Sequence, residues 1–218
     1  DYGFKAAIAT SEMATIESVL ANHGGRVRAD LSAFIGADAT IVTSTHEFSP
    51  GDARGNPGAF PFAGMLSAAA QGEAATDVVL IPGSGAYQIV VAPVRAPELI
   101  GWICIGFVID DALARAFKDL TNLDVSFSPA TRPVLLASTL GPDVRDAMPA
   151  ALAEAGGPYP RPVEVRVADA GYLTLSSPLP GAGHALVAIL QTSMDEALQG
   201  FRGLVTKVLI IVAIALVM

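Results

Sequence analysis

The chain contains an internal repeat, and this repeat restricts the fold more than any other feature of the sequence. The segment GAYQIVVAPV at 85–94 aligns without gaps with AGYLTLSSPL at 170–179, so that Tyr87 matches Tyr172 at an offset of 85 residues. A repeat of this length is too long for the units of a solenoid. It indicates a duplicated domain.

Two further matches occur in the same order along the chain. DDAL at 110–113 matches DEAL at 195–198 at the same offset. VTST at 42–45 matches LAST at 136–139 at an offset of 94 residues, which means that the second copy lacks about nine residues of the Pro- and Gly-rich loop at 49–61. Three matches in one order support a duplication of the whole unit.

Both copies are predicted to contain the same order of elements. In the first copy, apolar alternation and turn residues predict a helix at 62–71 and strands at 31–36, 40–45, 77–82, 86–95 and 99–108. In the second copy they predict a helix after Gly141 and strands at 123–128, 133–138, 162–168, 171–178 and 184–191. The order ββαβββ predicts an α+β protein with two tandem PAS-like modules, each a five-stranded antiparallel sheet with helical cover.

Helices are expected on both sides of the duplicated region. A long N-terminal helix at 12–28 begins after the N-cap residue Ser11. Its apolar residues recur at a spacing that suits packing along another helix: Met13, Ile16, Leu20 and Val27. A second helix begins at Ser193, which forms a capping-box pattern with Glu196.

The segment LVTKVLIIVAIALVM at 204–218 indicates the start of a transmembrane helix. Lys207 is its only charged residue, and a helix needs about 20 apolar residues to cross a bilayer. A buried soluble helix is the alternative. The chain opens at Asp1 without a signal peptide, so a second membrane helix upstream would make residues 1–200 a loop between two spans.

Charge and motif content argue against several classes of function. A net charge of −8 disfavours nucleic-acid binding and also a cytoplasmic loop tethered close to anionic lipid. His23, His46 and His184 lack the spacing of metal ligands, Cys104 sits in an apolar run, and Ser84 lies in a GSG turn without a nucleophile elbow. We therefore expect no catalytic residues, no metal and no cofactor in this chain.

A ligand pocket in a PAS-like module is expected between the sheet and the loop and helix that cover it. The candidate ligand-binding residues are Arg54, Tyr87, Arg95 and Trp102. An arginine beside aromatic side chains suits a small carboxylate. Tyr87 and Arg95 share one face of their strand because their separation is even, whereas Gln88 faces the other way. The alternative is that the two aromatic residues are core and the two arginines are solvated.

The acidic pair Asp110–Asp111 lies at the junction between a strand and the helix that carries Leu113. An aspartate at this position caps free backbone N–H groups and interacts favourably with the positive end of the helix. We expect this structural role, with ligand contact as the alternative. The equivalent pair Asp195–Glu196 in the second copy supports the capping role.

Three stretches of the sequence resemble double Cache sensory domains. These are DYGFKAA at 1–7, TIESVLANH at 15–23 and GWICIGFVIDDAL at 101–113, and the resemblance extends over about 2–200. It implies an extracytoplasmic sensory domain of a bacterial receptor whose cytoplasmic part is a GGDEF or EAL domain, a histidine kinase or a chemotaxis module. The third stretch is most similar to members attached to cyclic di-GMP enzymes. The Tyr, Arg, Trp, Tyr and Asp set of amino-acid-binding members has no residue-by-residue counterpart here.

The sequence thus predicts a signal-input domain. Its expected parts are N-terminal signalling helices at 1–29, a membrane-distal Cache module at 30–109, a membrane-proximal Cache module at 110–192, and a connecting helix leading into the membrane at 193–218. A small molecule or a protein partner in the periplasm would bias the junction formed by Gln191, Ser193 and Glu196, and the inner-membrane helix would carry the signal onward.

The output and the assembly remain open at this level. Control of cyclic di-GMP synthesis or hydrolysis is the first expectation. The alternatives are the sensor of a histidine kinase or chemoreceptor, or a periplasmic protein-docking module that binds no small ligand. Parallel packing of the helices at 12–28 and 193–218 predicts a homodimer.

Overall fold

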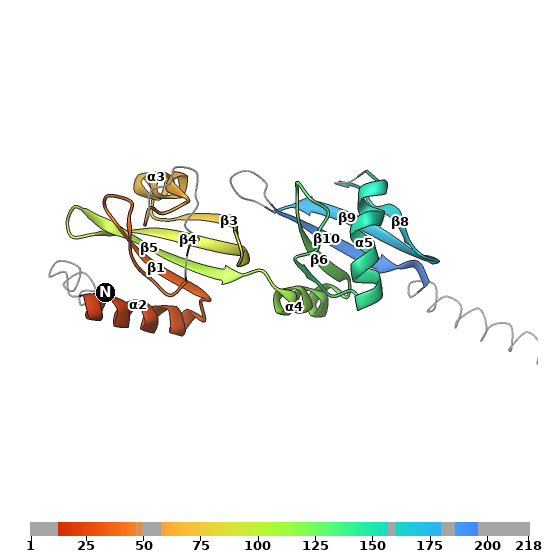
Figure 1. Ribbon diagram of the computed structural model, residues 1–218, viewed down its shortest axis with the longest axis horizontal. Coiled ribbons are helices and arrows are strands. Elements are labelled where there is room, and N and C mark those ends of the chain that lie inside the picture. Colours follow the sequence, from red (N-terminus) through yellow and green to blue (C-terminus); the bar gives the residue numbers. More distant parts are fainter. Residues whose placement is uncertain (1–12, 47, 49–57, 157–159, 180–185, 196–218) are drawn as a thin grey trace, which may run out of the picture. The chain divides into compact units, whose positions relative to one another are not determined.

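A computed structural model describes residues 13–46, 48, 58–156, 160–179 and 186–195 (Figure 1). The chain divides into two compact units, the first running to Ile109 and the second starting at Asp110. Each unit contains one five-stranded sheet in which neighbouring strands are antiparallel. The predicted α+β fold with two five-stranded modules is therefore confirmed.

The first module has the strand order β2-β1-β5-β4-β3. Its strands are β1 (Leu31–Gly36), β2 (Ile41–Ser44), β3 (Ala75–Ile81), β4 (Gly85–Arg95) and β5 (Leu99–Val108). Helix α2 (Met13–Val27) and helix α3 (Ala63–Gln71) lie on opposite sides of this sheet in Figure 1. The expected strand bounds agree with the observed ones to within two residues.

The main core of the first module lies between the sheet and α3. Alternate residues of β4 face this core, so Tyr87, Ile89 and Val91 are buried while Gln88 is exposed. Met65 and Leu66 of α3 pack against them, and the partly buried Ile41 of β2 packs against this core as well. Further buried apolar residues come from β1, β3 and β5: Leu31, Ala33, Ile35, Val79, Ile81, Trp102 and Cys104. Burial also raises the pKa of the Cys104 thiol to about 12, so this cysteine is an inert core residue.

Helix α2 packs against its own sheet. Ile16 is buried in a cluster with Phe34 and Val94, which lie on the sheet face opposite to α3. The helix approaches β1 closely at Gly24, where an added Cβ would lie 2.3 Å from the Ser32 hydroxyl oxygen. Ile16 and Leu20 of the apolar stripe are thus buried in this module, whereas Val27 is 51% exposed. The expectation that the stripe packs along another helix stays a prediction.

The second module repeats the topology with the order β7-β6-β10-β9-β8. Its helices are α4 (Asp111–Thr121) and α5 (Pro142–Glu154), and its strands are β6 (Asp124–Pro129), β7 (Ala137–Ser138), β8 (Val163–Val167), β9 (Ala170–Pro178) and β10 (Leu186–Ser193). Met148 and Leu152 of α5 pack on one face of the sheet with Ile189. Phe117 of α4 contacts Phe127 on the other face, at 6.2 Å between ring centroids.

The strand expected at 133–138 contains only two residues, Ala137 and Ser138. The preceding residues form turns instead, since the Arg132 N–H bonds the Pro129 carbonyl and the Val134 N–H bonds the Arg132 carbonyl. Pro133 has no N–H to offer a strand partner, which explains why pairing starts later.

The duplication is visible in matching contacts. Tyr87 lies opposite Val108 in the first sheet, and Tyr172 lies opposite Ser193 in the second, both pairs shifted by 85 residues. The Ser32 N–H donates to the Thr45 hydroxyl at 2.9 Å, and the Val125 N–H donates to the Thr139 hydroxyl at 2.9 Å. The match between VTST and LAST therefore corresponds to one repeated side-chain hydrogen bond.

Among the described helices, none is long and apolar enough to cross a membrane. The predicted membrane segment at 204–218 lies outside the described residues, as do Glu196 and most of the connecting helix.

Candidate functional site

Two of the predicted site residues, Tyr87 and Trp102, lie on the α3-facing side of the first sheet but at opposite ends of it. Both are buried, with exposed fractions of 7% and 6%. Trp102 is opposite Pro93 on β4, and Tyr87 lies six residues before Pro93. At about 3.3 Å per residue along a strand, this separates the two aromatic residues by roughly 20 Å. They cannot contact one small ligand together.

Trp102 and Arg95 belong to the same end of the sheet. Arg95 Nη2 donates to the Ala70 carbonyl in the last turn of α3 at 2.9 Å, which places the guanidinium on the side of the sheet that α3 covers. The predicted shared face of Tyr87 and Arg95 is consistent with this contact. The indole Nε1 of Trp102 is fully buried and has no hydrogen-bond partner within the described part of the chain.

A buried donor without an acceptor is costly. Leaving an N–H group desolvated and unpaired destabilises a protein by about 1–3 kcal/mol. Arg95 has further N–H donors besides the Nη2 that contacts the helix, because a guanidinium carries five of them. Trp102 therefore offers a buried donor at the end of the sheet where Arg95, an exposed residue, contacts the last turn of α3.

At the other end of the same sheet, Tyr87 belongs to an aromatic cluster. His46 follows β2, and its ring lies 5.6 Å from that of Tyr87 and 6.1 Å from that of Phe48. His46 Nε2 and the Ser84 hydroxyl are 2.9 Å apart. Burial raises the pKa of Tyr87, and the negative charge of Asp30 adds to this rise.

Sequence reasoning missed His46 and Ser84 as neighbours. It placed one at a loop edge and the other in a turn, and the 38 residues between them carry no periodic signal. Phe48, Phe60 and Phe62 continue the cluster with ring separations of 5.7 and 5.6 Å. The density of phenylalanine in a loop rich in Gly and Pro was the one available hint. Arg54, the remaining predicted ligand residue, lies outside the described residues.

The second module differs from the first in the polarity of the corresponding face. Ile189 packs against α5, and the register places Ser126 and Ser176 beside it on the same face. Six buried polar residues share this face: Ser126, Ser128, Ser138, Thr174, Ser176 and Gln191. We call them the polar face. The equivalent positions of Thr174 and Ser176 in the first sheet are Ile89 and Val91, which are apolar.

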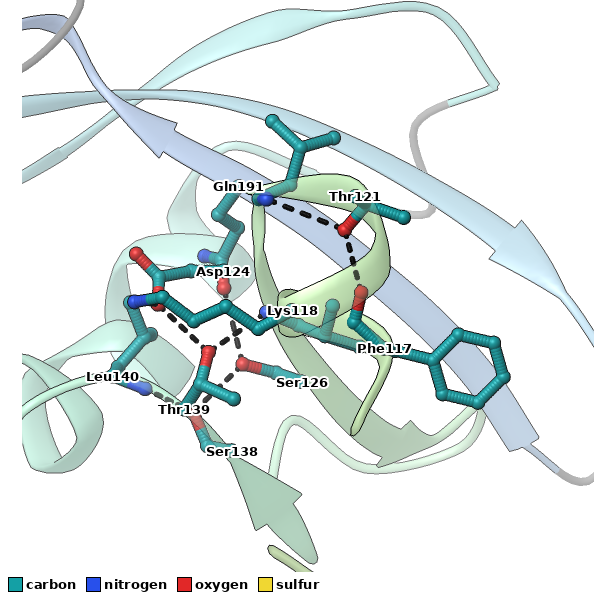
Figure 2. A network of polar contacts seen from close by, with 11 residues as sticks. Phe117, Lys118, Thr121, Asp124, Ser126, Ser138, Thr139, Leu140 and Gln191 are labelled. Atoms are coloured by element: carbon teal, nitrogen blue, oxygen red, sulfur yellow. Dashed lines mark hydrogen bonds and ion pairs between the residues drawn. The ribbon is translucent and has the colours of Figure 1, made fainter. Parts of the chain in front are cut away.

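Hydrogen bonds connect part of the polar face across three strands (Figure 2). The Ser126 hydroxyl donates to Gln191 Oε1 at 3.1 Å and lies 2.8 Å from the Ser138 hydroxyl. The Leu140 N–H donates to the Ser138 hydroxyl at 3.1 Å, which extends the network to the start of α5. Gln191 is 1% exposed, and its Nε2 has no hydrogen-bond partner among the described residues.

Asp124 closes the edge of this network. Its Oδ1 accepts from Lys118 Nζ at 2.6 Å and from the Thr139 hydroxyl at 2.7 Å. The Thr139 hydroxyl in turn accepts from the Val125 N–H. Figure 2 shows Lys118 reaching from α4 toward Asp124 beside Thr139. The charge of Asp124 is thereby compensated within the module.

The acidic pair at the start of α4 performs two different tasks. Asp110 is the N-cap residue, and its Oδ1 accepts from the Leu113 N–H at 2.9 Å, which confirms the predicted cap. Asp111 instead accepts from the Ser138 N–H and from Arg145 of α5, both at 2.8 Å. The hydrogen bond from Arg145 holds the pKa of Asp111 below its usual value despite partial burial. Asp111 thus links α4, β7 and α5.

The predicted relay residues lie at the end of β10. Gln191 is buried in the polar face, Ser193 is the last residue of the strand, and helical backbone follows at Met194–Asp195. The strand therefore passes directly into the connecting segment. Both the sheet contacts of Gln191 and the helix that follows depend on the position of the same strand.

Comparison with known proteins identifies the family. A family model described as the double sensory domain of two-component sensor kinase matches residues 1–191. The chain belongs to this double Cache family. Its members are extracytoplasmic sensory modules of membrane receptors, so the described domain senses and does not catalyse. The comparison with curated proteins found no match to this chain.

Solved structures confirm the tandem Cache fold. The sensor domain of the V. cholerae histidine kinase DctB shares 15% identity over 88% of this chain and 84% of its own, with a TM-score of 0.54. The ligand-binding domain of the Pseudomonas fluorescens chemoreceptor CtaA in complex with L-isoleucine shares 14% identity over 91% and 83%, with a TM-score of 0.52. The ligand-binding domain of Mlp24 with asparagine shares 12% over 90% and 82%, also with 0.52. At these identities the likeness establishes the fold alone.

Proposed function

We propose that this double Cache domain is the signal-input part of a membrane-bound two-component sensor kinase and that it recognises a small carboxylate at its first sheet. The single observation that supports a ligand there is the buried, unpartnered Nε1 of Trp102. The description of the matching family supports the kinase output.

The chemistry at the Trp102 end favours an anionic oxygen ligand. The indole N–H is a donor only, and the guanidinium of Arg95 is a permanent cation with several donors. A carboxylate accepts from both, and hydrogen bonds to a charged partner contribute roughly 1.5–3 kcal/mol each. Relatives of this fold include receptor domains crystallised with amino acids, which carry such a carboxylate. The aromatic cluster around Tyr87 and His46 lies too far away to share the same small ligand.

The output domain is the less constrained part of the proposal. The resemblance of the 101–113 stretch favoured receptors that control cyclic di-GMP, whereas the family description favours a kinase. A chemoreceptor is the second candidate, supported by the likeness to the CtaA domain. Phosphotransfer by the full-length receptor would identify a kinase output. Turnover of cyclic di-GMP would instead identify the output expected from the 101–113 stretch.

Signal transfer is proposed to run through β10. The domain would lie in the periplasm, anchored in the inner membrane by the apolar segment at 204–218, and pair as a homodimer through the helix that follows Ser193. Within the stripe of α2, Ile16 and Leu20 are buried and Val27 is exposed, so the end of α2 at Val27 is the part that could add to such a dimer. A ligand would shift β10, and with it Gln191, Ser193 and Glu196, only if it bound one of two states more tightly.

The ligand proposal is tested by calorimetry with amino acids, monocarboxylates and dicarboxylates on the full chain. Trp102→Phe keeps an aromatic ring in the core but removes the Nε1 donor, and Arg95→Gln removes the charge. Each change is expected to weaken binding of the best carboxylate at least tenfold, since about 1.4 kcal/mol corresponds to a factor of ten. Gln88→Ala, on the opposite face of β4, is the matched control and should bind like the wild type.

Unchanged affinity in both variants would place the ligand elsewhere. Absence of binding by any carboxylate would favour the alternative of a protein-docking module. The relay proposal is tested separately, by locking the 193–200 helices of the full-length receptor in different rotational registers with disulfides. Output that is the same in every register would contradict it.

A further inference from the structure

The polar face of the second module has no structural equivalent in the first. Duplicated sheets that need only a stable core would both carry apolar residues beneath the helix, as β4 does with Ile89 and Val91. The second sheet has Thr174 and Ser176 at those positions, buried to 0% and 6% exposure. The Thr174 hydroxyl donates to the Tyr172 carbonyl at 3.4 Å. A hydrogen-bonded hydroxyl still buries less apolar surface than the isoleucine and valine of the first sheet, so it contributes less hydrophobic stabilisation.

The polar face does not provide hydrogen-bond partners for all of its own polar groups, as Gln191 shows. The amide oxygen accepts from Ser126, but both N–H donors of Nε2 lack partners among the described residues. The residue is only 1% exposed. The amide lies on the sheet face that α5 covers, because Gln191 is two residues from Ile189 in β10. The donor therefore lies on the side of the sheet that α5 covers.

The surrounding groups select the chemistry of an occupant. Asp124 is the ionisable residue in register with Gln191, and Lys118 and Thr139 already engage it. Lys118 already pairs with Asp124, so a charged ligand would be buried without a free counter-ion, at a cost of several kcal/mol. Hydroxyl groups can donate or accept. An uncharged molecule with a carbonyl or hydroxyl oxygen and its own donors is complementary to this set.

We propose that the second module contains a separate binding site for a small uncharged amide or polyol, in which Gln191 Nε2 donates to the oxygen of the ligand and the hydroxyl of Thr174 accepts from it. The site lies in a different module from the carboxylate site at Trp102. Its occupancy acts on β10 directly, because Gln191 belongs to the strand that enters the connecting helix.

The test is an NMR titration of the isotope-labelled full chain in detergent. The probes are acetamide, glycerol and acetate, the last being a charged isostere of the first. The side-chain NH₂ signal of Gln191 is assigned by its loss in Gln191→Leu. We expect a saturable shift of this signal with acetamide or glycerol and no shift with acetate. In Gln191→Leu, which lacks the signal, and in Thr174→Val, which retains the shape of the side chain, backbone amide shifts of β10 should report at least tenfold weaker binding.

Trp102→Phe is the matched control, because it alters the other module and should leave this titration unchanged. The absence of a saturable shift with either neutral probe would overturn the proposal. So would equal binding in Thr174→Val and the wild type, or an ordered water bonded to Gln191 Nε2 that no probe displaces in crystals of the soaked protein. The two-variant design keeps the test valid if Gln191→Leu alters the fold.

Discussion

Replacing Gln191 with leucine is expected to stabilise the second module, although it removes a buried hydrogen bond. The change deletes the bond from Ser126, worth about 1 kcal/mol, and also deletes an unpaired buried donor, which costs about 1–3 kcal/mol. Leucine has a similar length and adds favourable apolar contact. The net result is a gain of about 1 kcal/mol in the free energy of unfolding. Ser126 keeps its contact with Ser138 at 2.8 Å, so its hydroxyl is not left without a partner.

Ser126→Ala removes the same hydrogen bond from its other side but should lower the free energy of unfolding. Alanine leaves Gln191 Oε1 without its donor while Nε2 is still unpaired, so the whole amide is then buried without a partner. Such a loss costs about 1–3 kcal/mol. The two single substitutions therefore differ in sign, which an argument based on counting hydrogen bonds would not predict.

Native-state hydrogen exchange of the full chain measures both effects by module. Amides of β10 and β6 report the second module, and amides of β4 and β5 serve as an internal control in the first. Gln191→Leu should slow the slowest exchange in β10 about fivefold, the factor that corresponds to 1 kcal/mol, and leave β4 unchanged. Faster exchange in β10 of this variant would refute the reasoning, since it would mean that Nε2 has a partner in the folded protein.

Three further substitutions test other parts of the account. Asp110→Ala removes the cap of α4 and should cost about 1 kcal/mol, measured by urea unfolding, whereas Asp110→Asn should cost less because asparagine also caps. Asp111→Asn tests the contact with Arg145: the folded pKa lies below the unfolded value, so the contact stabilises above about pH 4 and is lost as the pH falls through the folded pKa. The variant should therefore be less stable than the wild type at pH 7 and equal to it at about pH 2, and a constant difference between the two curves would contradict this. Ile16→Ala, at 3% exposure, should cost about 2–4 kcal/mol and speed the exchange of α2 amides, with the exposed Ser18→Ala as a neutral control.

Much of the architecture follows from local patterns. The period of two in 86–95 identifies the buried face of β4, and Pro and Gly residues follow β3 and β4 where these strands end. The cap at Asp110 is predictable because it depends on residues within one helical turn. The duplication adds long-range information, since two copies with matching segments are expected to have the same strand order even where single strands are ambiguous.

Contacts between distant segments were decided by the tertiary structure. The pattern of α2 shows that Ile16 and Leu20 share a face, but a stripe on a helix does not reveal whether a sheet or another helix covers it. Tyr87 and Trp102 share a sheet face, yet the antiparallel register places them at opposite ends. Asp111 meets Arg145 across 34 residues with no local signal.

The polar face shows most clearly what the sequence pattern determines and what only the tertiary packing determines. The sequence contains Thr174 and Ser176 where the first copy has Ile89 and Val91, and it contains Gln191 near the end of a strand. Only the packing shows that these side chains are buried and that Gln191 Nε2 has no hydrogen-bond partner among the described residues. The physical reason is that a period of two assigns residues to a face, whereas burial depends on which helix covers that face and on the register of the neighbouring strands.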